Sequence, residues 1–229
     1  MVVDKYIYLL LSILLLLIWS VFFLFLKKEV RRILIKASVV GGLAGLIAEF
    51  WYFKDYWRPP LLFGDAKIFL EDFLFGFAFT GIAATIYKVL FKKEGSKHEK
   101  GHRIIFFVFF VIGILSLLLF NNLLKINSIF VSSFVFLILS FMMVFIRKDL
   151  VMQSIMSGIL SLSVIIPIYI LLFNFISPGY WDKYWLLANT AFGIKIIGNI
   201  PVTELLWYFS WSCLAGIAYD FYHGNKGEA

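Results

Sequence analysis

The sequence predicts an all-α integral membrane protein with about seven transmembrane helices. Of its 229 residues, 62% are hydrophobic and 20% aromatic, whereas only 15% are charged, a composition outside the range of soluble globular proteins. Seven apolar runs reach the roughly 20 residues that a bilayer requires. The net charge of +7 comes from Lys and Arg at the ends of these runs, so we expect no nucleic-acid partner.

Charged or turn-forming residues separate the runs and set their order. Residues 6–26 form the first run, which is too long for the apolar core of a signal peptide and lacks a small-residue cleavage site, so it is expected to remain as a helix. The other predicted helices span residues 33–53, 68–91, 104–124, 128–146, 151–176 and 201–222. Asn121, Asn122 and Lys125 indicate the turn between the fourth and fifth helices.

The distribution of Lys and Arg predicts the orientation, because cytoplasmic loops carry the positive excess. The basic residues gather after the first, third and fifth helices: Lys27, Lys28, Arg31, Arg32 and Lys36; Lys88, Lys92, Lys93, Lys97, Lys100 and Arg103; Arg147 and Lys148. The N-terminus is therefore expected outside the cell membrane and the C-terminus in the cytoplasm.

Two distant stretches, residues 69–75 and 201–207, indicate an internal repeat. A shift of 132 residues pairs Asp72 with Glu204, and it also pairs four aromatic positions on each helix. In each helix the aromatic side chains three and seven residues after the acid share its face: Phe75 and Phe79, then Trp207 and Trp211. We expect one membrane domain, 1–229, with two parallel three-helix repeats, 1–92 and 127–229, joined by a loop and linking helix, 93–126.

Four acids are expected at similar depth near the outer ends of their helices: Glu49, Glu71, Asp72 and Glu204. Taken alone, either motif is explained by structure, as a row of packing residues behind a carboxylate that stabilises the start of a helix. The recurrence of the motif in both helices favours a function for the acids. Clustered carboxyls in apolar surroundings disfavour ionisation, so at least one is expected to stay protonated and act as a general acid. Aromatic faces behind it stabilise a cation. This combination suits protonation of an apolar alkene.

These motifs resemble those of the lycopene cyclase domain family, the flavin-independent membrane cyclases of bacteria, archaea and fungi. Glu71-Asp72 and Pro201-x-x-Glu204 match its Pro-x-Glu-Glu/Asp motif, although Phe69 replaces the proline of the first and Thr203 the first acid of the second. The family cyclises the ends of linear carotenoids without net redox change, as an intramolecular lyase or isomerase. The resemblance implies catalysis by Glu71, Asp72 and Glu204, without a cofactor, and substrate contacts from Glu49, Phe75, Phe79, Trp207 and Trp211.

Other functions stay open at this point. A carotenoid end-group hydratase would use the same acids, with water capturing the cation. A small transporter or lipid-binding membrane protein is the non-enzyme alternative, although transporters place their sites near the bilayer midplane and these acids lie at helix starts. The expected partners are membrane lipids and an apolar carotenoid or isoprenoid substrate that enters from the bilayer. The sequence leaves open whether the chain acts alone, as a homodimer or in a heteromer.

Three further patterns are given structural interpretations. Gly41, Gly42 and Gly45 form a small-residue face suited to close helix packing. Six tryptophans are expected near the outer leaflet, where an interfacial belt explains several of them: Trp51, Trp57, Trp181, Trp185, Trp207 and Trp211. The pair His98 and His102 lies in a charged linker, so no metal site is expected there.

Overall fold

The computed structural model describes residues 3–61, 70–91 and 100–225, and within them the chain is almost entirely helical. The long helices are α1 (Asp4–Phe25), α2 (Lys28–Asp55), α3 (Leu70–Phe91), α4 (Arg103–Leu117), α5 (Ser128–Ile146), α6 (Val151–Tyr169) and α8 (Val202–His223). Wider π-helical turns, Leu118–Leu123 and Ile170–Ile176, continue α4 and α6. The remaining elements are a 3₁₀ turn, Lys148–Leu150, the short helix α7 (Tyr180–Tyr184) and an antiparallel strand pair, β1 (Lys195–Ile196) and β2 (Ile200–Pro201).

Each of the seven predicted apolar runs contains a helix, and six of these helices are long and apolar enough to cross a membrane. The chain is therefore an integral membrane protein of mostly helical structure. The helix outside this group is α8, which carries Glu204 and Asp220 within 22 residues that also include several serines and tyrosines. These polar side chains lower the hydropathy of α8, and most of them face the protein interior.

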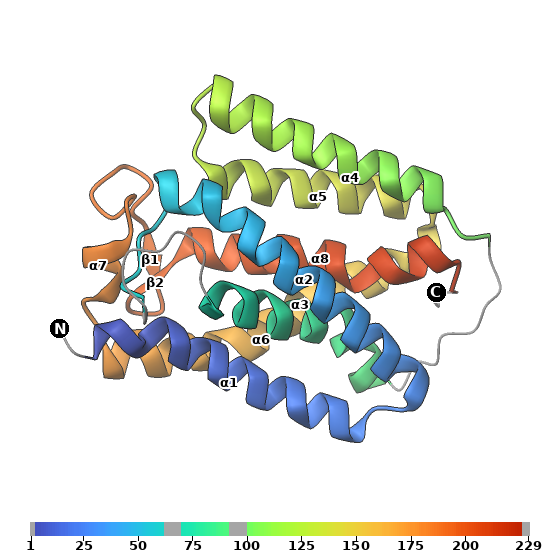
Figure 1. Cartoon of the computed structure of the whole chain (residues 1–229), viewed down its shortest axis with the longest axis horizontal. Coiled ribbons are helices and arrows are strands. Elements are labelled where there is room, and N and C mark those ends of the chain that lie inside the picture. The colour runs from blue at the N-terminus through green and yellow to red at the C-terminus, as the bar shows by residue number, and fades with distance from the viewer. Residues whose placement is uncertain (1–2, 62–69, 92–99, 226–229) are drawn as a thin grey trace.

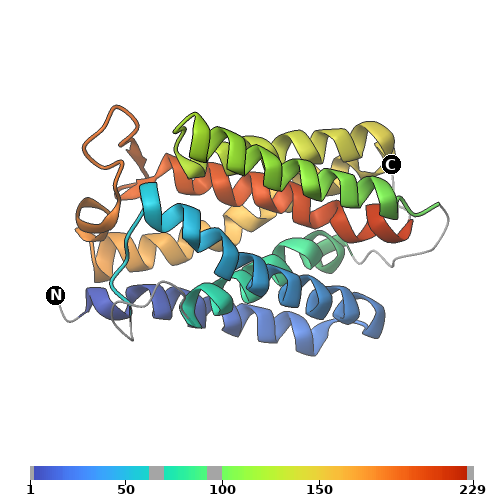
Figure 2. The same ribbon diagram turned by 45° about the horizontal axis from the view of Figure 1, so that its top comes forward.

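Two central helices, α3 and α8, organise the bundle. Figures 1 and 2 show α4 and α5 along one side of the molecule and α1 along the opposite side, with α3 and α8 between them. Helix α3 packs against α1 and α2, α8 packs against α5 and α6, and α3 and α8 also contact each other. Residues that follow Asp72 and Glu204 along these two helices therefore meet at the centre of the bundle.

The predicted close packing of the glycine face is confirmed, because α2 lies almost backbone to backbone on α3. A Cβ atom added at Gly41 would lie 2.3 Å from the Thr80 Cβ and 2.5 Å from the Gly76 carbonyl oxygen. One added at Gly45 would lie 2.6 Å from the carbonyl oxygen of Asp72. Only glycine permits this approach, which brings α2 close to the acid motif of α3.

The connections after α2 and before α8 pair with each other over one end of the bundle. The Arg58 amide donates to the Tyr184 carbonyl at 2.9 Å, and the Leu186 amide donates to the Tyr56 carbonyl at 2.9 Å. Trp181 and Trp185 are only 1% and 3% exposed. The paired connections draw both rings into the core, where Trp181 stacks on Trp57.

At the other end of α3 and α8, a buried ion pair joins the two helices. The Lys88 Nζ atom lies 2.6 Å from the Asp220 Oδ2 atom, and both side chains are almost fully buried. Gln153 of α6 donates to the same oxygen at 2.6 Å, and Asn225 donates to Oδ1 at 2.9 Å. Both carboxylate oxygens of Asp220 therefore have partners.

Candidate active site

A cavity of about 110 Å³ lies between α2, α3 and α8, near the end of the bundle covered by the paired connections. Three carboxyls from these three helices line it: Glu49, Asp72 and Glu204. Each has at most 9% of its surface exposed. All four aromatic residues singled out from the sequence also line it: Phe75, Phe79, Trp207 and Trp211.

Glu71, the other motif acid, is buried at the start of α3 but is not among the described residues that line the cavity. Its neighbour Asp72 takes the cavity side of the helix, because successive helical side chains point about 100° apart. Phe69, which replaces the motif proline, lies outside the described residues. Within the described ranges no group of three His, Cys, Asp or Glu side chains is arranged to hold a metal ion, and His98 lies outside them.

Asp72 is held by the first helix and by the glycine face of the second. The Tyr8 hydroxyl of α1 donates to the Asp72 Oδ1 atom at 2.7 Å. The backbone of Asp72 lies against Gly45, where a Cβ atom would collide with it. Contacts with α1 and α2 therefore fix the position of the Asp72 carboxyl.

Glu204 is held by two phenols, one on each oxygen. Tyr56 donates to Oε1 and Tyr169 to Oε2, each at 2.6 Å. The Tyr169 hydroxyl also lies 2.7 Å from that of Tyr208, which extends the network along α8. Burial, together with the neighbouring Glu204 charge, raises the pKa of Tyr56 well above its usual value, so this phenol stays protonated and remains a donor.

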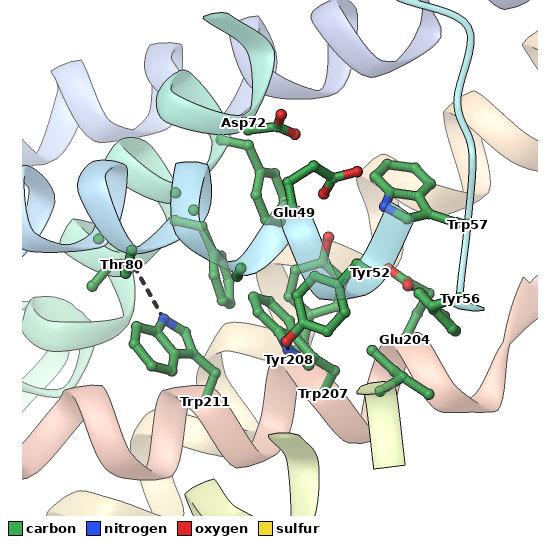
Figure 3. A pocket seen from close by; sticks show the side chains of 18 of the residues that line it. Glu49, Tyr52, Tyr56, Trp57, Asp72, Thr80, Glu204, Trp207, Tyr208 and Trp211 are labelled. Atoms are coloured by element: carbon green, nitrogen blue, oxygen red, sulfur yellow. Dashed lines mark hydrogen bonds between the residues drawn. The ribbon is translucent and has the colours of Figure 1, made fainter. Parts of the chain in front are cut away.

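Glu49 lies near the last turn of α2, and Figure 3 shows its carboxyl between Asp72 and Glu204. The side chain is only 4% exposed. Its Oε1 atom has no hydrogen-bond partner among the described residues. Glu49 therefore differs from Glu204, whose oxygens both accept strong hydrogen bonds.

The aromatic side chains of the two motif helices meet across the cavity. Phe75 and Phe79 stack with ring centroids 6.0 Å apart, and Trp207 and Trp211 stack at 6.2 Å. The two rows come into contact where the ring centroids of Phe79 and Trp207 lie 6.1 Å apart. Because the faces of aromatic rings carry partial negative charge, such walls stabilise a cation that develops between them.

Hydrogen bonds fix the orientation of the two indoles. The Trp207 Nε1 atom donates to the Tyr52 hydroxyl at 2.7 Å, and the Trp211 Nε1 atom donates to the Thr80 hydroxyl at 3.1 Å (Figure 3). Both bonds cross between helices, from α8 to α2 and from α8 to α3. The ring planes are therefore set before any ligand binds.

Sequence reasoning missed the hydroxyls that hold the acids: Tyr8, Tyr52, Tyr56, Tyr169 and Tyr208. A signal existed for the first three, since they lie at the same ends of their helices as the acids and a rise of 1.5 Å per residue gives them similar depth. Tyr169 and Tyr208 had no such signal, because a tyrosine inside an apolar helix reads equally as packing.

The comparison with protein families supports the interpretation of the motifs. Residues 127–222 match the family model described as lycopene cyclase. No curated protein and no solved structure matches the chain. The resemblance noted from the motif acids is therefore confirmed over these residues, which match a lycopene cyclase domain. The matched segment contains Glu204, Trp207 and Trp211, whereas Glu49, Trp57 and Asp72 precede it.

Proposed function

We propose, from the lycopene cyclase domain in residues 127–222, that this membrane protein is a carotenoid end-group cyclase, an isomerase that closes a ring at the end of a linear carotenoid. The observation that carries the proposal is the shared cavity. Three buried carboxyls converge there from three helices, within walls made of aromatic rings. Acid and cation stabilisation, the two requirements of alkene cyclisation, are thus combined in one apolar space.

The proposed reaction is balanced without a cofactor or an oxidant. A carboxyl proton adds to one carbon of a terminal alkene, leaving a cation on the neighbouring carbon. A second alkene of the same end group supplies its electron pair, and the new carbon–carbon bond closes the ring. A carboxylate then removes a proton from a ring carbon, which restores a double bond, so the product is an isomer of the substrate.

Asp72 and Glu204 are the motif acids that line the cavity, and proton transfer is proposed to occur among the carboxyls there. Glu71 remains a proposed catalytic residue on the strength of the motif alone, and Glu71→Gln tests it. Phe75, Phe79, Trp207 and Trp211 are proposed to stabilise the cation and shape the space. A volume of about 110 Å³ suits the end group rather than a whole linear carotenoid, so the polyene chain would extend into the bilayer.

Three structural expectations join this proposal. Helix α8 spans the membrane as the seventh helix, the N-terminus lies outside, and α3 and α8 end two related three-helix units. Each unit would then contribute one acid and one aromatic row to the shared cavity. The matching packing of α3 on α1 and α2, and of α8 on α5 and α6, supports the repeat.

Expression in a host that accumulates lycopene, followed by chromatography of the extracted pigments, tests the function. Ring closure twists the end-group double bond out of the polyene plane or takes it out of conjugation, so a cyclised product changes both retention and absorbance. Hydroxylated end groups in the product would identify a hydratase instead. Unchanged pigment from every linear carotenoid tried, with the protein folded in the membrane, would refute the enzyme and favour a transporter or binding protein.

A further inference from the structure

The three carboxyls of the cavity differ in how their oxygens are bound. Each oxygen of Glu204 accepts a hydrogen bond of 2.6 Å from a phenol. The Glu49 Oε1 atom is completely buried and has no hydrogen-bond partner among the described residues. Two acids in one apolar space thus have opposite environments.

This difference predicts opposite protonation states. A carboxylate carries only acceptor sites, and two phenol donors, one on each oxygen, satisfy the charge of Glu204. An ionised carboxylate with a bare oxygen in apolar surroundings is far costlier than the neutral acid, because nothing there replaces the lost water. With Asp72 and Glu204 near it and no cation among the described residues of the cavity, Glu49 is therefore a protonated member of the group.

The surroundings of Glu49 also leave room for an alkene. Glu49 lies at the end of the small-residue face of α2, where Gly45 and Ala48 also line the cavity. The stacked rings of Phe75 and Phe79 belong to the neighbouring helix. A substrate end group in the cavity would therefore lie between an acid that has a proton to give and rings that stabilise the resulting cation.

We propose that Glu49 is the acid that protonates the terminal alkene and that Glu204 is the carboxylate that accepts the proton from the ring, an assignment that rests on the proposed function. The Glu49 O–H bond breaks as the new C–H bond forms. After ring closure the C–H bond adjacent to the cation breaks, its electrons form the double bond, and its proton goes to Glu204. Return of that proton to Glu49 resets both groups, so no outside proton is consumed.

The test compares two substitutions at position 49 in the lycopene-accumulating host. Glu49→Gln keeps the shape of the side chain but has no acidic proton, and it should lower ring formation at least 100-fold. Glu49→Asp keeps the proton on a side chain one methylene shorter, and it should retain activity within about tenfold of the parent. A packing role would give the reverse order, because glutamine fills the space of glutamate better than aspartate does.

Glu29→Gln is the matched control, since Glu29 lies on the same helix and is exposed. It should form rings at the rate of the parent. The quantity of each variant in the membrane measures folding, and the absorbance shift of bound lycopene measures binding. Glu49→Gln should match the parent in both measurements, so that its loss of ring formation reports the chemical step.

Two outcomes would overturn the assignment. Ring formation by Glu49→Gln near the parent rate would show that another group gives the proton, and a less active Glu49→Asp than Glu49→Gln would show that position 49 acts through packing. A parent that forms no ring from any linear carotenoid is a different result, because it refutes the proposed function itself.

Discussion

The two ends of the α3–α8 pair use acidic residues in opposite ways. At one end, Asp72 and Glu204 line a cavity in which the acids receive hydrogen bonds from tyrosines. At the other end, Asp220 is bound by Lys88 at 2.6 Å. The shift that pairs Asp72 with Glu204 in the sequence also pairs Lys88 with Asp220. Equivalent positions on the two helices thus carry like charges at the cavity end and opposite charges at the ion-pair end.

This difference separates a functional from a structural use of buried charge. At the ion-pair end, the lysine and two amide donors satisfy the carboxylate, so the group joins α3, α6 and α8. At the cavity end, acids close to one another cost stability unless protons are shared among them. An arrangement that is costly for folding and suited to proton transfer is what an acid-catalysed site requires.

The largest effect on stability is expected at the ion-pair end. Lys88→Met leaves the buried Asp220 carboxylate without its cation, which should lower the free energy of unfolding by about 3–5 kcal/mol. Thermal unfolding in detergent measures this loss. The double variant Lys88→Met/Asp220→Asn removes both charges and keeps an acceptor for Gln153, so it should recover most of the loss. Equal unfolding temperatures for Lys88→Met and the parent would refute the structural role.

At the cavity end the largest effect should fall on activity. Glu204→Gln removes the carboxylate while preserving its shape, and loss of acid–base catalysis typically costs a factor of 10² or more. Ring formation should therefore fall at least 100-fold, whereas the unfolding temperature should stay near that of the parent. Pigment chromatography and thermal unfolding on the same membranes measure both. An inactive variant that also unfolds early would contradict the contrast between the two ends.

The sequence predicted the helices well because a bilayer imposes a simple rule on composition. Apolar runs of spanning length located all seven long helices, and the glycine face of α2 correctly predicted close packing on α3. The rule says nothing about irregular backbone at the membrane surface. The pairing of the two connections and the buried positions of Trp181 and Trp185 depend on contacts between distant segments, which no local pattern reports.

The candidate site was predictable in its acids but not in their partners. A carboxylate in an apolar run is rare enough to be noticed. Helix depth placed four acids together, of which Glu49, Asp72 and Glu204 line the cavity and Glu71 does not. Whether Tyr169 faces an acid or packs among leucines depends on helix rotation and tertiary contacts. The hydrogen-bond pattern that distinguishes Glu49 from Glu204 therefore required the structure.

A smaller effect is expected where the backbone of α2 meets the cavity-end acid of α3. Gly45→Ala places a Cβ atom 2.6 Å from the Asp72 carbonyl oxygen, so the helices must separate. Overpacking of this kind costs about 1–3 kcal/mol. Ring formation should also fall, because the shift moves Asp72. The control is Gly179→Ala, because a Cβ atom added at Gly179 would lie 3.8 Å from its nearest neighbour, the Lys183 Cε atom. This variant should leave the unfolding temperature and the activity unchanged.

The smallest effect should follow a change in the aromatic wall. Trp211→Phe keeps an aromatic face but loses the indole hydrogen bond to Thr80, which is worth about 0.5–1.5 kcal/mol. If the ring stabilises the cation mainly through its face, the rate should fall by less than tenfold, and Trp211→Leu, which has no such face, should be slower still.

Thr80→Val removes the same hydrogen bond and leaves the tryptophan in place, so it isolates the positioning effect. Initial rates of ring formation at equal protein levels compare the three variants. Equal rates for Trp211→Phe and Trp211→Leu would mean that the wall acts by filling space, and charge stabilisation at the cavity end would then rest on the carboxylates alone.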